Sequence, residues 1–333
     1  MTITLPPVPH RGRLTVLALI LPLAVLVVAL GVAIALLPQL PNPVATHWGP
    51  SGTPDGFGSP IETLVMLTVI VVAFSVGMWA LGFFLGSSAS TRRLSVFFAL
   101  WFAAALSGLL VGSLVMQRGL SDASQAPGIG LPLGLSFGFA TVLGALAAAL
   151  MPGDAHQPTT TPVPADAERL PLGPGEQVAW VRTVEPPHLT WLIGGGAVLA
   201  MAAIGLGLLG ATTVGFTFGI TMALLTLAFS LFSRWTVTID REGLRAHTVL
   251  PRPRTVVPLD EVESAEVAEV RPLPDFGGWG YRIDSTGRVG IVVRAGEAIL
   301  IHRTGGRQLL VTVDDATTGA ALLNTLADRA RMR

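Results

Sequence analysis

The chain has 333 residues, of which 51% are hydrophobic and only 13% are charged, and its mean hydropathy is +0.64. A soluble domain carries about a quarter charged residues, so this composition favours a membrane protein. The net charge of zero argues against bulk nucleic-acid binding. The absence of cysteine and lysine excludes disulfides, thiolate metal sites, cysteine nucleophiles, Schiff-base chemistry and the lysine of a phosphate-binding loop.

Six apolar runs are each long enough to cross a hydrocarbon core of about 30 Å, which takes roughly 20 helical residues. None of them contains a charged residue. The first is longer than a signal-peptide core and lacks a small-residue cleavage site, so we expect an uncleaved span. The runs cover residues 14–37, 64–85, 94–116, 131–151, 189–209 and 214–232.

Arginine placement predicts the orientation, because basic residues near the ends of spans favour the cytoplasm. No basic residue lies between Arg13 and Arg92, so the first loop is expected outside, whereas Arg92 and Arg93 mark the second loop as inside. Arg118, in the third loop, is the one exception. With an even number of spans, both termini are expected in the cytoplasm.

The pattern divides the chain into five parts. A four-span domain occupies residues 1–151, with an outer proline- and glycine-rich motif at 38–61. Residues 152–174 are rich in Pro, Thr and Ala and predict a flexible, partly extended cytoplasmic linker. Residues 175–187 include a possible strand of the tail domain at 175–184. A transmembrane hairpin at 188–233 and a cytoplasmic β domain at 234–333 complete the chain.

The last hundred residues alternate short apolar stretches with turn residues, which predicts strands. Asp314 and Asp315 can cap a helix that runs to about Arg331, with apolar positions spaced three and four apart. Strands followed by one amphipathic helix predict a small barrel closed by that helix. The strand candidates are 235–239, 244–250, 254–257, 264–270, 281–284, 290–294, 298–303 and 308–313.

The first outer loop carries the most distinctive motif of the chain. It resembles the signature of a bacterial membrane family of unknown function, domain of unknown function 1648, which also supplies the N-terminal part of SdpI-type immunity proteins. The resemblance covers about the first hundred residues. Where the family's motif ends in a serine-lysine pair, this chain has Ser59 and Pro60. The matching positions are Pro41, Thr46, His47, Trp48, Gly52, Pro54, Asp55 and Gly56.

The tail resembles bacterial pleckstrin-homology-like (PH-like) domains attached to membrane spans. The similarity lies in residues 257–265 (VPLDEVESA), in the loop Gly277, Gly278, Trp279 and Gly280, and in the closing helix. In such proteins a strand sometimes precedes a membrane hairpin that interrupts the domain. The resemblance implies the same for residues 175–184.

His47 and Asp55 are the best candidates for a functional site. Histidine is the residue type that changes charge near neutral pH, and with a carboxylate it could hold a cation or report external pH. Two ligands are too few for a tight structural metal site. The alternative is a rigid turn in which both side chains bond backbone groups and Trp48 lies at the lipid interface.

Other candidate sites are weaker. The glycine-rich loop at 277–280 lacks the spacing of a dinucleotide fingerprint and reads as a turn with a membrane-facing or core tryptophan. From Arg234 onward there are fourteen arginines against thirteen acids, which argues against a general anionic-lipid surface. Arg252 and Arg254 could still form a local headgroup contact. Glycine pairs four apart, including Gly108/Gly112 and Gly134/Gly138, predict close helix packing.

These observations predict a non-enzymatic membrane protein with a sensing, accessory or scaffold role, and with a cytoplasmic domain that binds a protein partner. We expect no catalytic residues, metal or cofactor, and homo-oligomers are compatible with the sequence. The SdpI resemblance implies a version related to envelope stress or peptide immunity. A transporter or channel component is one alternative, although no charge lies in the middle of a run. A membrane enzyme or metal site built on the outer His/Asp motif is another.

Overall fold

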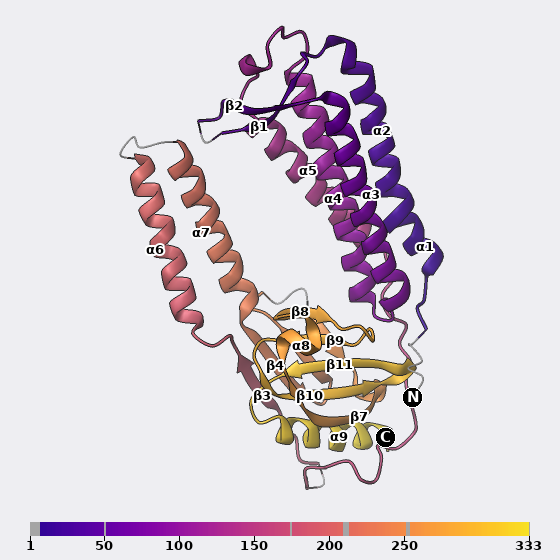
Figure 1. Cartoon of the computed structure of the whole chain (residues 1–333). Helices are drawn as coiled ribbons and strands as arrows, with labels where there is room; N and C mark the ends of the chain where they lie inside the picture. Colours follow the sequence, from indigo (N-terminus) through magenta and orange to yellow (C-terminus); the bar gives the residue numbers. More distant parts are fainter. Residues whose placement is uncertain (1–6, 50, 174, 209–212, 251–253, 333) are drawn as a thin grey trace. The chain divides into compact units, whose positions relative to one another are not determined.

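A computed structural model describes residues 7–332 except 50, 174, 209–212 and 251–253. The chain forms two compact units. One, the bundle unit, contains residues 8–154, and the other, the tail unit, contains residues 155–209 and 215–333. Figure 1 labels their helices and strands.

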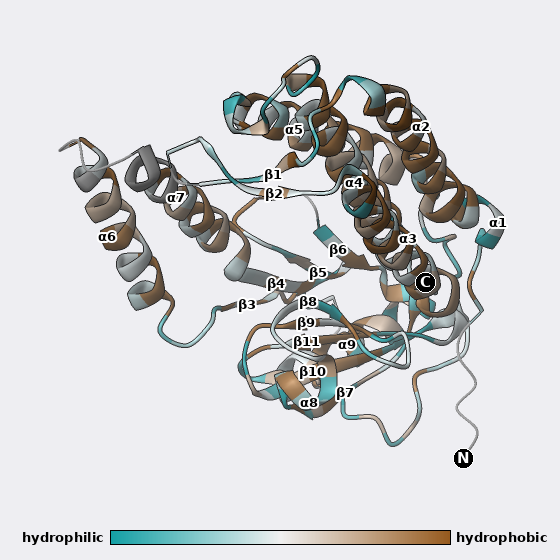
Figure 2. Ribbon diagram, turned by 45° about the horizontal axis from the view of Figure 1, so that its top comes forward, coloured by the Kyte–Doolittle hydropathy of each residue, from teal (hydrophilic) through white to brown (hydrophobic). Residues whose placement is uncertain are grey.

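The bundle unit is built from long apolar helices. Its first helix is continuous through α1 (Arg11–Thr15), a π-helical turn (Val16–Ile20) and α2 (Leu21–Leu36), and it ends in a 3₁₀ turn, Leu37–Gln39. The others are α3 (Pro60–Leu85), α4 (Ala89–Met116) and α5 (Gly130–Ala149), with a short 3₁₀ helix at Ala123–Gln125 between the last two. Figure 2 shows these helices as predominantly hydrophobic.

Helix α4 forms the centre of the bundle, because it packs against α2, α3 and α5 and its own residues are the most buried. Gly108 and Gly112 lie so close to α5 that an added Cβ would be 2.9 Å from Ser136 Oγ and from Pro132 Cβ, respectively. This confirms the close packing predicted for that glycine pair. The prediction of close packing within the bundle was wrong for Gly134 and Gly138, because a Cβ added to either would have no neighbouring atom within 4 Å.

Four helices of the described chain are long and apolar enough to cross a membrane: Arg11–Gln39, Pro60–Leu85, Ala89–Met116 and Gly130–Ala149. The last two predicted runs form apolar helices α6 (Leu189–Leu208) and α7 (Thr213–Ser233) in the tail unit. They pack together, since a Cβ on Gly219 of α7 would lie 2.6 Å from Ile204 of α6. These apolar helices suggest a membrane protein.

The remainder of the tail unit holds two β-sheets. The four-stranded sheet has the order β3-β4-β5-β6 and is antiparallel throughout. The five-stranded sheet has the order β7-β10-β11-β9-β8, with one parallel pair, β11 and β9. The strands are β3 (Trp180–Val184), β4 (Trp235–Asp240), β5 (Gly243–His247), β6 (Arg254–Val257), β7 (Val262–Val270), β8 (Gly280–Ile283), β9 (Val289–Val292), β10 (Gly296–Arg303) and β11 (Arg307–Thr312).

The strand expected before the hairpin is present as β3, and it pairs with β4 from Trp180↔Ile239 to Val184↔Trp235. Helices α6 and α7 are therefore an insertion between two neighbouring strands of one sheet. All eight strands predicted further along the tail are present, with ends shifted by up to three residues.

The tail core lies between the two sheets and α9 (Ala316–Arg331), which contacts β7, β10, β4 and β5. Alternating strand residues such as Val237, Ile239, Ile299 and Ile301 are fully buried there. A smaller core on the outer face of β10 is covered by α8 (Pro272–Phe276). The predicted closed barrel is not confirmed, because in the described residues the strands pair into two separate sheets.

The expected flexible linker has no regular secondary structure, but it is bound along the tail unit. The Leu170 amide donates to Thr325 Oγ1 of α9 at 2.9 Å, and Val163 is buried in the main tail core. Arg169 donates to the carbonyls of Val163 at 2.9 Å and Ala167 at 2.8 Å. Several backbone groups of this segment therefore bond partners more than a hundred residues away in the chain.

Candidate functional site

The motif at residues 38–61, predicted to lie outside and called the outer motif here, contains a two-stranded hairpin (the outer hairpin), β1 (Val44–Trp48) and β2 (Pro54–Gly58). Its register places His47 opposite Gly56 and Trp48 opposite Pro54. The Thr46 hydroxyl donates to the Gly56 carbonyl at 3.3 Å. Gly52 lies in the turn with φ +80°, a conformation that favours glycine. Pro41 is buried just before β1.

His47 and Asp55 form a pair on the surface of this hairpin, with 2.5 Å between His47 Nδ1 and Asp55 Oδ1. Their side chains are 73% and 48% exposed, respectively. Two glycines make room for them. A Cβ on Gly56 would lie 2.8 Å from His47 Cβ, and one on Gly49 would lie 2.6 Å from Asp55 Oδ2. Gly49 and Gly56 are therefore explained by the space that the pair occupies.

The hairpin is fastened to the bundle by Gln117, which directly follows α4 and is fully buried. The Ala45 amide donates to Gln117 Oε1 at 2.7 Å, and Gln117 Nε2 donates to the Ala45 carbonyl at 3.1 Å. Trp48 Nε1 donates to the Pro127 carbonyl at 2.9 Å. Val44 is fully buried against bundle residues such as Leu110. The exposed pair is thus held on a fixed support.

One imidazole and one carboxylate can hold a cation weakly, accept a donor from a ligand, or change charge with a proton. In the described residues there is no group of three or more His, Cys, Asp or Glu that could hold a metal ion.

Asp122, beside the 3₁₀ helix that contacts the hairpin, has its pKa lowered by hydrogen bonds from the backbone and side chain of Ser124.

The other end of α4 is fastened as well. Arg92 is fully buried and donates to the carbonyls of Gly86 at 2.8 Å and Ser87 at 3.1 Å. It also pairs with Asp154 at 3.1 Å. Asp154 is the last residue of the bundle unit before the chain enters the tail unit at Ala155. A single helix therefore carries the support of the outer hairpin at one end and the start of the connection to the tail at the other.

The first residues of the tail unit are held by a buried carboxylate. Glu261 Oε2 lies 2.5 Å from Arg303 and 3.2 Å from Arg307, and its Oε1 accepts from the Gln157 amide at 3.0 Å. His156 lies 2.9 Å from Asp260 and 3.3 Å from Glu261. Burial raises the pKa of Glu261. The hydrogen bonds from Arg303 and Gln157, together with the charges of Arg303 and Arg307, lower this pKa by more, so it lies below its usual value.

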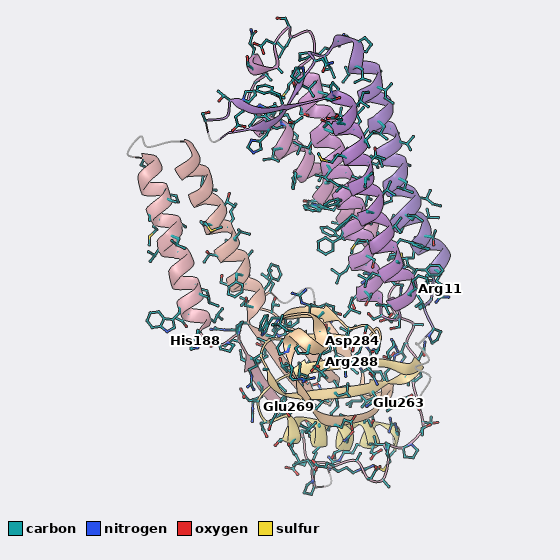
Figure 3. The ribbon with its side chains drawn as sticks, in the orientation of Figure 1. Arg11, His188, Glu263, Glu269, Asp284 and Arg288 are labelled. Atoms are coloured by element: carbon teal, nitrogen blue, oxygen red, sulfur yellow. The ribbon has the colours of Figure 1, made fainter. Side chains whose placement is uncertain are left out.

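The other predicted tail residues are not gathered into a site. Gly277, Gly278 and Gly280 all have positive φ and form a turn after α8, which leaves Trp279 half exposed. Arg254 is exposed at the start of β6, and Arg252 lies outside the described residues. The neighbouring β8–β9 turn is tied by Arg288 and Asp284, 2.9 Å apart (Figure 3). An open depression of about 490 Å³ lies where β3 ends and β4 begins, lined in part by Glu185, Arg234 and Arg294.

Gln117 and Glu261 were not singled out by sequence reasoning, and Arg92 was noted only as a marker of topology. Gln117 is the first polar residue with an amide after the third apolar run, which is the one signal that marks it. Glu261 lies inside the segment 257–265 that suggested the PH-like resemblance, but the acidic residues around it in the sequence indicated a solvent-exposed side chain.

A family model described as a domain of unknown function (DUF1648) matches residues 24–72. The match covers much of α2, the whole outer hairpin and the first half of α3. No curated protein matches this chain, and no solved structure matches it.

Proposed function

We propose that this chain is a non-enzymatic sensing or accessory protein of the bacterial cytoplasmic membrane, which reports an external ligand or condition to a cytoplasmic protein partner of its tail. The observation that carries the proposal is the bonding at the two ends of α4. Gln117 is hydrogen-bonded to Ala45 in the hairpin that carries His47 and Asp55. Arg92 pairs with Asp154, where the chain enters the tail unit.

In this proposal α6 and α7 are the fifth and sixth spans. Their 20 and 21 residues correspond to about 30 Å of helix, which matches the hydrocarbon core. Both termini then lie in the cytoplasm, as the arginines favour. The succession of antiparallel strands and a C-terminal helix supports a PH-like relationship for the tail, interrupted by the hairpin. Reporter tags at each loop test the topology, and a C-terminal tag found outside the cell would contradict it.

The fixed outer pair favours recognition over a purely structural turn. A pair that only braced the turn would not need to be exposed, because backbone bonds and glycine spacing already define the hairpin. An exposed, positioned pair loses little conformational entropy when it binds a partner group. The resemblance to SdpI-type proteins makes toxic peptides or envelope stress the first conditions to test.

The test is complementation of a deletion strain. Loss of the chain is expected to lower tolerance to membrane-active peptides or envelope stress, and the wild-type chain is expected to restore it. His47→Ala and Asp55→Ala are expected to fail to restore tolerance at equal protein level, whereas Ser51→Ala, in the adjacent exposed turn, restores it. If both pair variants restore tolerance fully, recognition by the pair is wrong. If the purified His47→Ala and Asp55→Ala variants show the same hydrolytic activity as the wild-type chain, the membrane-enzyme alternative is also wrong. Flux into liposomes that contain the purified chain tests the transporter alternative.

A further inference from the structure

One end of the four-stranded sheet is joined directly to the apolar hairpin. Val184 ends β3 five residues before α6 begins, and Trp235 begins β4 two residues after Ser233, the last residue of α7. Two extended residues reach about 7 Å at most. Because α7 matches the thickness of the hydrocarbon core, Ser233 lies at its inner boundary, and Trp235 lies within the headgroup layer.

The strand register shows which other residues lie at this end. Val184 is opposite Trp235, Thr236 is opposite His247, and His247 is opposite Arg254. Neighbouring strands lie about 4.8 Å apart, so this row extends roughly 10 Å sideways from the point where the chain leaves the bilayer. The opposite end of the same strands is the turn between Asp240 and Gly243, about 17 Å away along β4.

The chain continues beyond this row on the membrane side. Strand β5 runs back toward the end of α7, and after His247 it leads into Val249 and Leu250, which are 55% and 37% exposed. Val249 and Leu250 are thus two adjacent exposed aliphatic side chains in the chain segment that follows β5. At the start of α6, Trp191 is 81% exposed, which is typical of the aromatic belt at a membrane surface.

Arginines lie at this end of the sheet together with acids. Arg234 precedes β4 and Arg254 begins β6, while Glu185 pairs with Arg234 at 2.7 Å and Asp314 pairs with Arg294 in the same region. Long arginine side chains at this depth reach phosphate groups while their stems stay near the apolar layer. The acidic strand β7 belongs to the other sheet.

We infer that Val249 and Leu250 insert into the cytoplasmic leaflet of the membrane that the chain itself spans, with Arg234 and Arg254 at the headgroups. The tail domain is thereby held against the bilayer by a second contact besides its covalent link to α6 and α7. This inference rests on the proposed function in one respect, which is that α6 and α7 cross the membrane.

The test uses the absence of cysteine, which allows single-cysteine variants of the full chain. Leu250→Cys and Val249→Cys carry a small fluorophore in lipid nanodiscs, where nitroxide lipids report the bilayer and iodide reports water. Glu242→Cys, on the turn at the far end of the sheet, is the matched control, and Leu199→Cys in the middle of α6 tests the span. The labels at 249 and 250 are expected to be quenched by lipid nitroxide near the headgroup and to lose quenching by iodide, with the opposite result at 242.

The outcomes separate two claims, the insertion of Val249 and Leu250 into the leaflet and the crossing of the membrane by α6 and α7. If the label at 199 is quenched by lipid but those at 249 and 250 behave like 242, the insertion is wrong and the span stands. Protection of 249 and 250 from both quenchers means contact with protein and also overturns the insertion. If the label at 199 is quenched by iodide, the proposed span itself is wrong. In the Leu250→Cys background, Val249→Asp is expected to abolish lipid quenching, whereas Val249→Ile preserves it.

Discussion

The two units of this chain use the same device in different surroundings. In the bundle unit, the buried amide of Gln117 bonds both the N–H and the C=O of Ala45 in strand β1. In the tail unit, the buried amide of Asn324 on α9 bonds both the N–H and the C=O of Ala265 in strand β7, each at 2.8 Å. In each case a side-chain amide completes the bonding of a strand as a neighbouring strand would.

The surroundings differ, and so should the consequences of losing the amide. Asn324 lies in the middle of the main tail core and also donates to the Glu168 carbonyl at 2.9 Å, so it joins helix, sheet and connecting segment. Gln117 lies at the end of a bundle whose helices pack without it. The comparison shows that Asn324 bonds a strand and the connecting segment to its helix, whereas Gln117 bonds a single strand of the hairpin.

The largest effect is expected for Asn324→Leu. The two buried backbone groups of Ala265 and the more exposed Glu168 carbonyl lose their partner, and at roughly 1–3 kcal/mol for each buried group the tail should lose about 4 kcal/mol of stability. Thermal unfolding of the purified full chain, followed by the near-ultraviolet signal of the tail tryptophans, measures it. Thr317→Leu, on the exposed side of the same helix, is the control. Equal melting of Asn324→Leu and wild type would contradict the comparison.

Glu261→Gln is expected to destabilise the tail by about 3 kcal/mol, because it leaves two largely buried guanidinium groups without their carboxylate. The pKa of Glu261 is lowered in the folded tail, so its contribution is fully present above the unfolded value near 4.3 and is lost as pH falls through the folded value. Wild-type stability should therefore fall below about pH 4.5, and the variant should show a shallower fall. Parallel pH profiles for the two proteins would argue against this role.

Gln117→Leu is expected to cost about 2 kcal/mol at the hairpin, because the two backbone groups of Ala45 lose their partner. Hydrogen exchange should rise across residues 44–58 while helix α4 stays protected. Gln125→Leu changes an exposed amide nearby and should leave exchange unchanged. Global unfolding of the bundle in Gln117→Leu would break the contrast with Asn324.

The smallest effect is expected for Arg169→Ala, about 1 kcal/mol. Its ion pair with Asp328 is partly exposed, and the carbonyls that it binds can turn to water. The change should appear as faster proteolysis of residues 158–168 with little shift in melting temperature. Arg241→Ala, in the exposed β4–β5 turn, is the control.

Periodicity and composition predicted most of the elements but not the contacts that join them. Apolar runs and alternating stretches depend on local sequence, which is why the helices and the eight tail strands were found. Gln117, Asn324 and Glu261 act through partners 42 or more residues away, apart from helix bonds, and no local pattern contains that information. Residues 152–174 looked flexible for the same reason. Asp315 was predicted as a helix cap and occupies that position, but its carboxylate bonds Trp180, Arg182 and the Thr318 hydroxyl in place of a backbone amide.

Communication from the outer hairpin to the tail through α4 is tested most directly by hydrogen exchange in the first tail residues. The amides of Gln157, Thr159 and Val163 bond Glu261, Asp260 and Asp328, respectively, so their exchange reports how firmly this segment is held. In nanodiscs, Gln117→Leu is expected to speed exchange at residues 155–163 relative to wild type and to Gln125→Leu. Faster exchange in the hairpin with no change at residues 155–163 would contradict a link between the two sides.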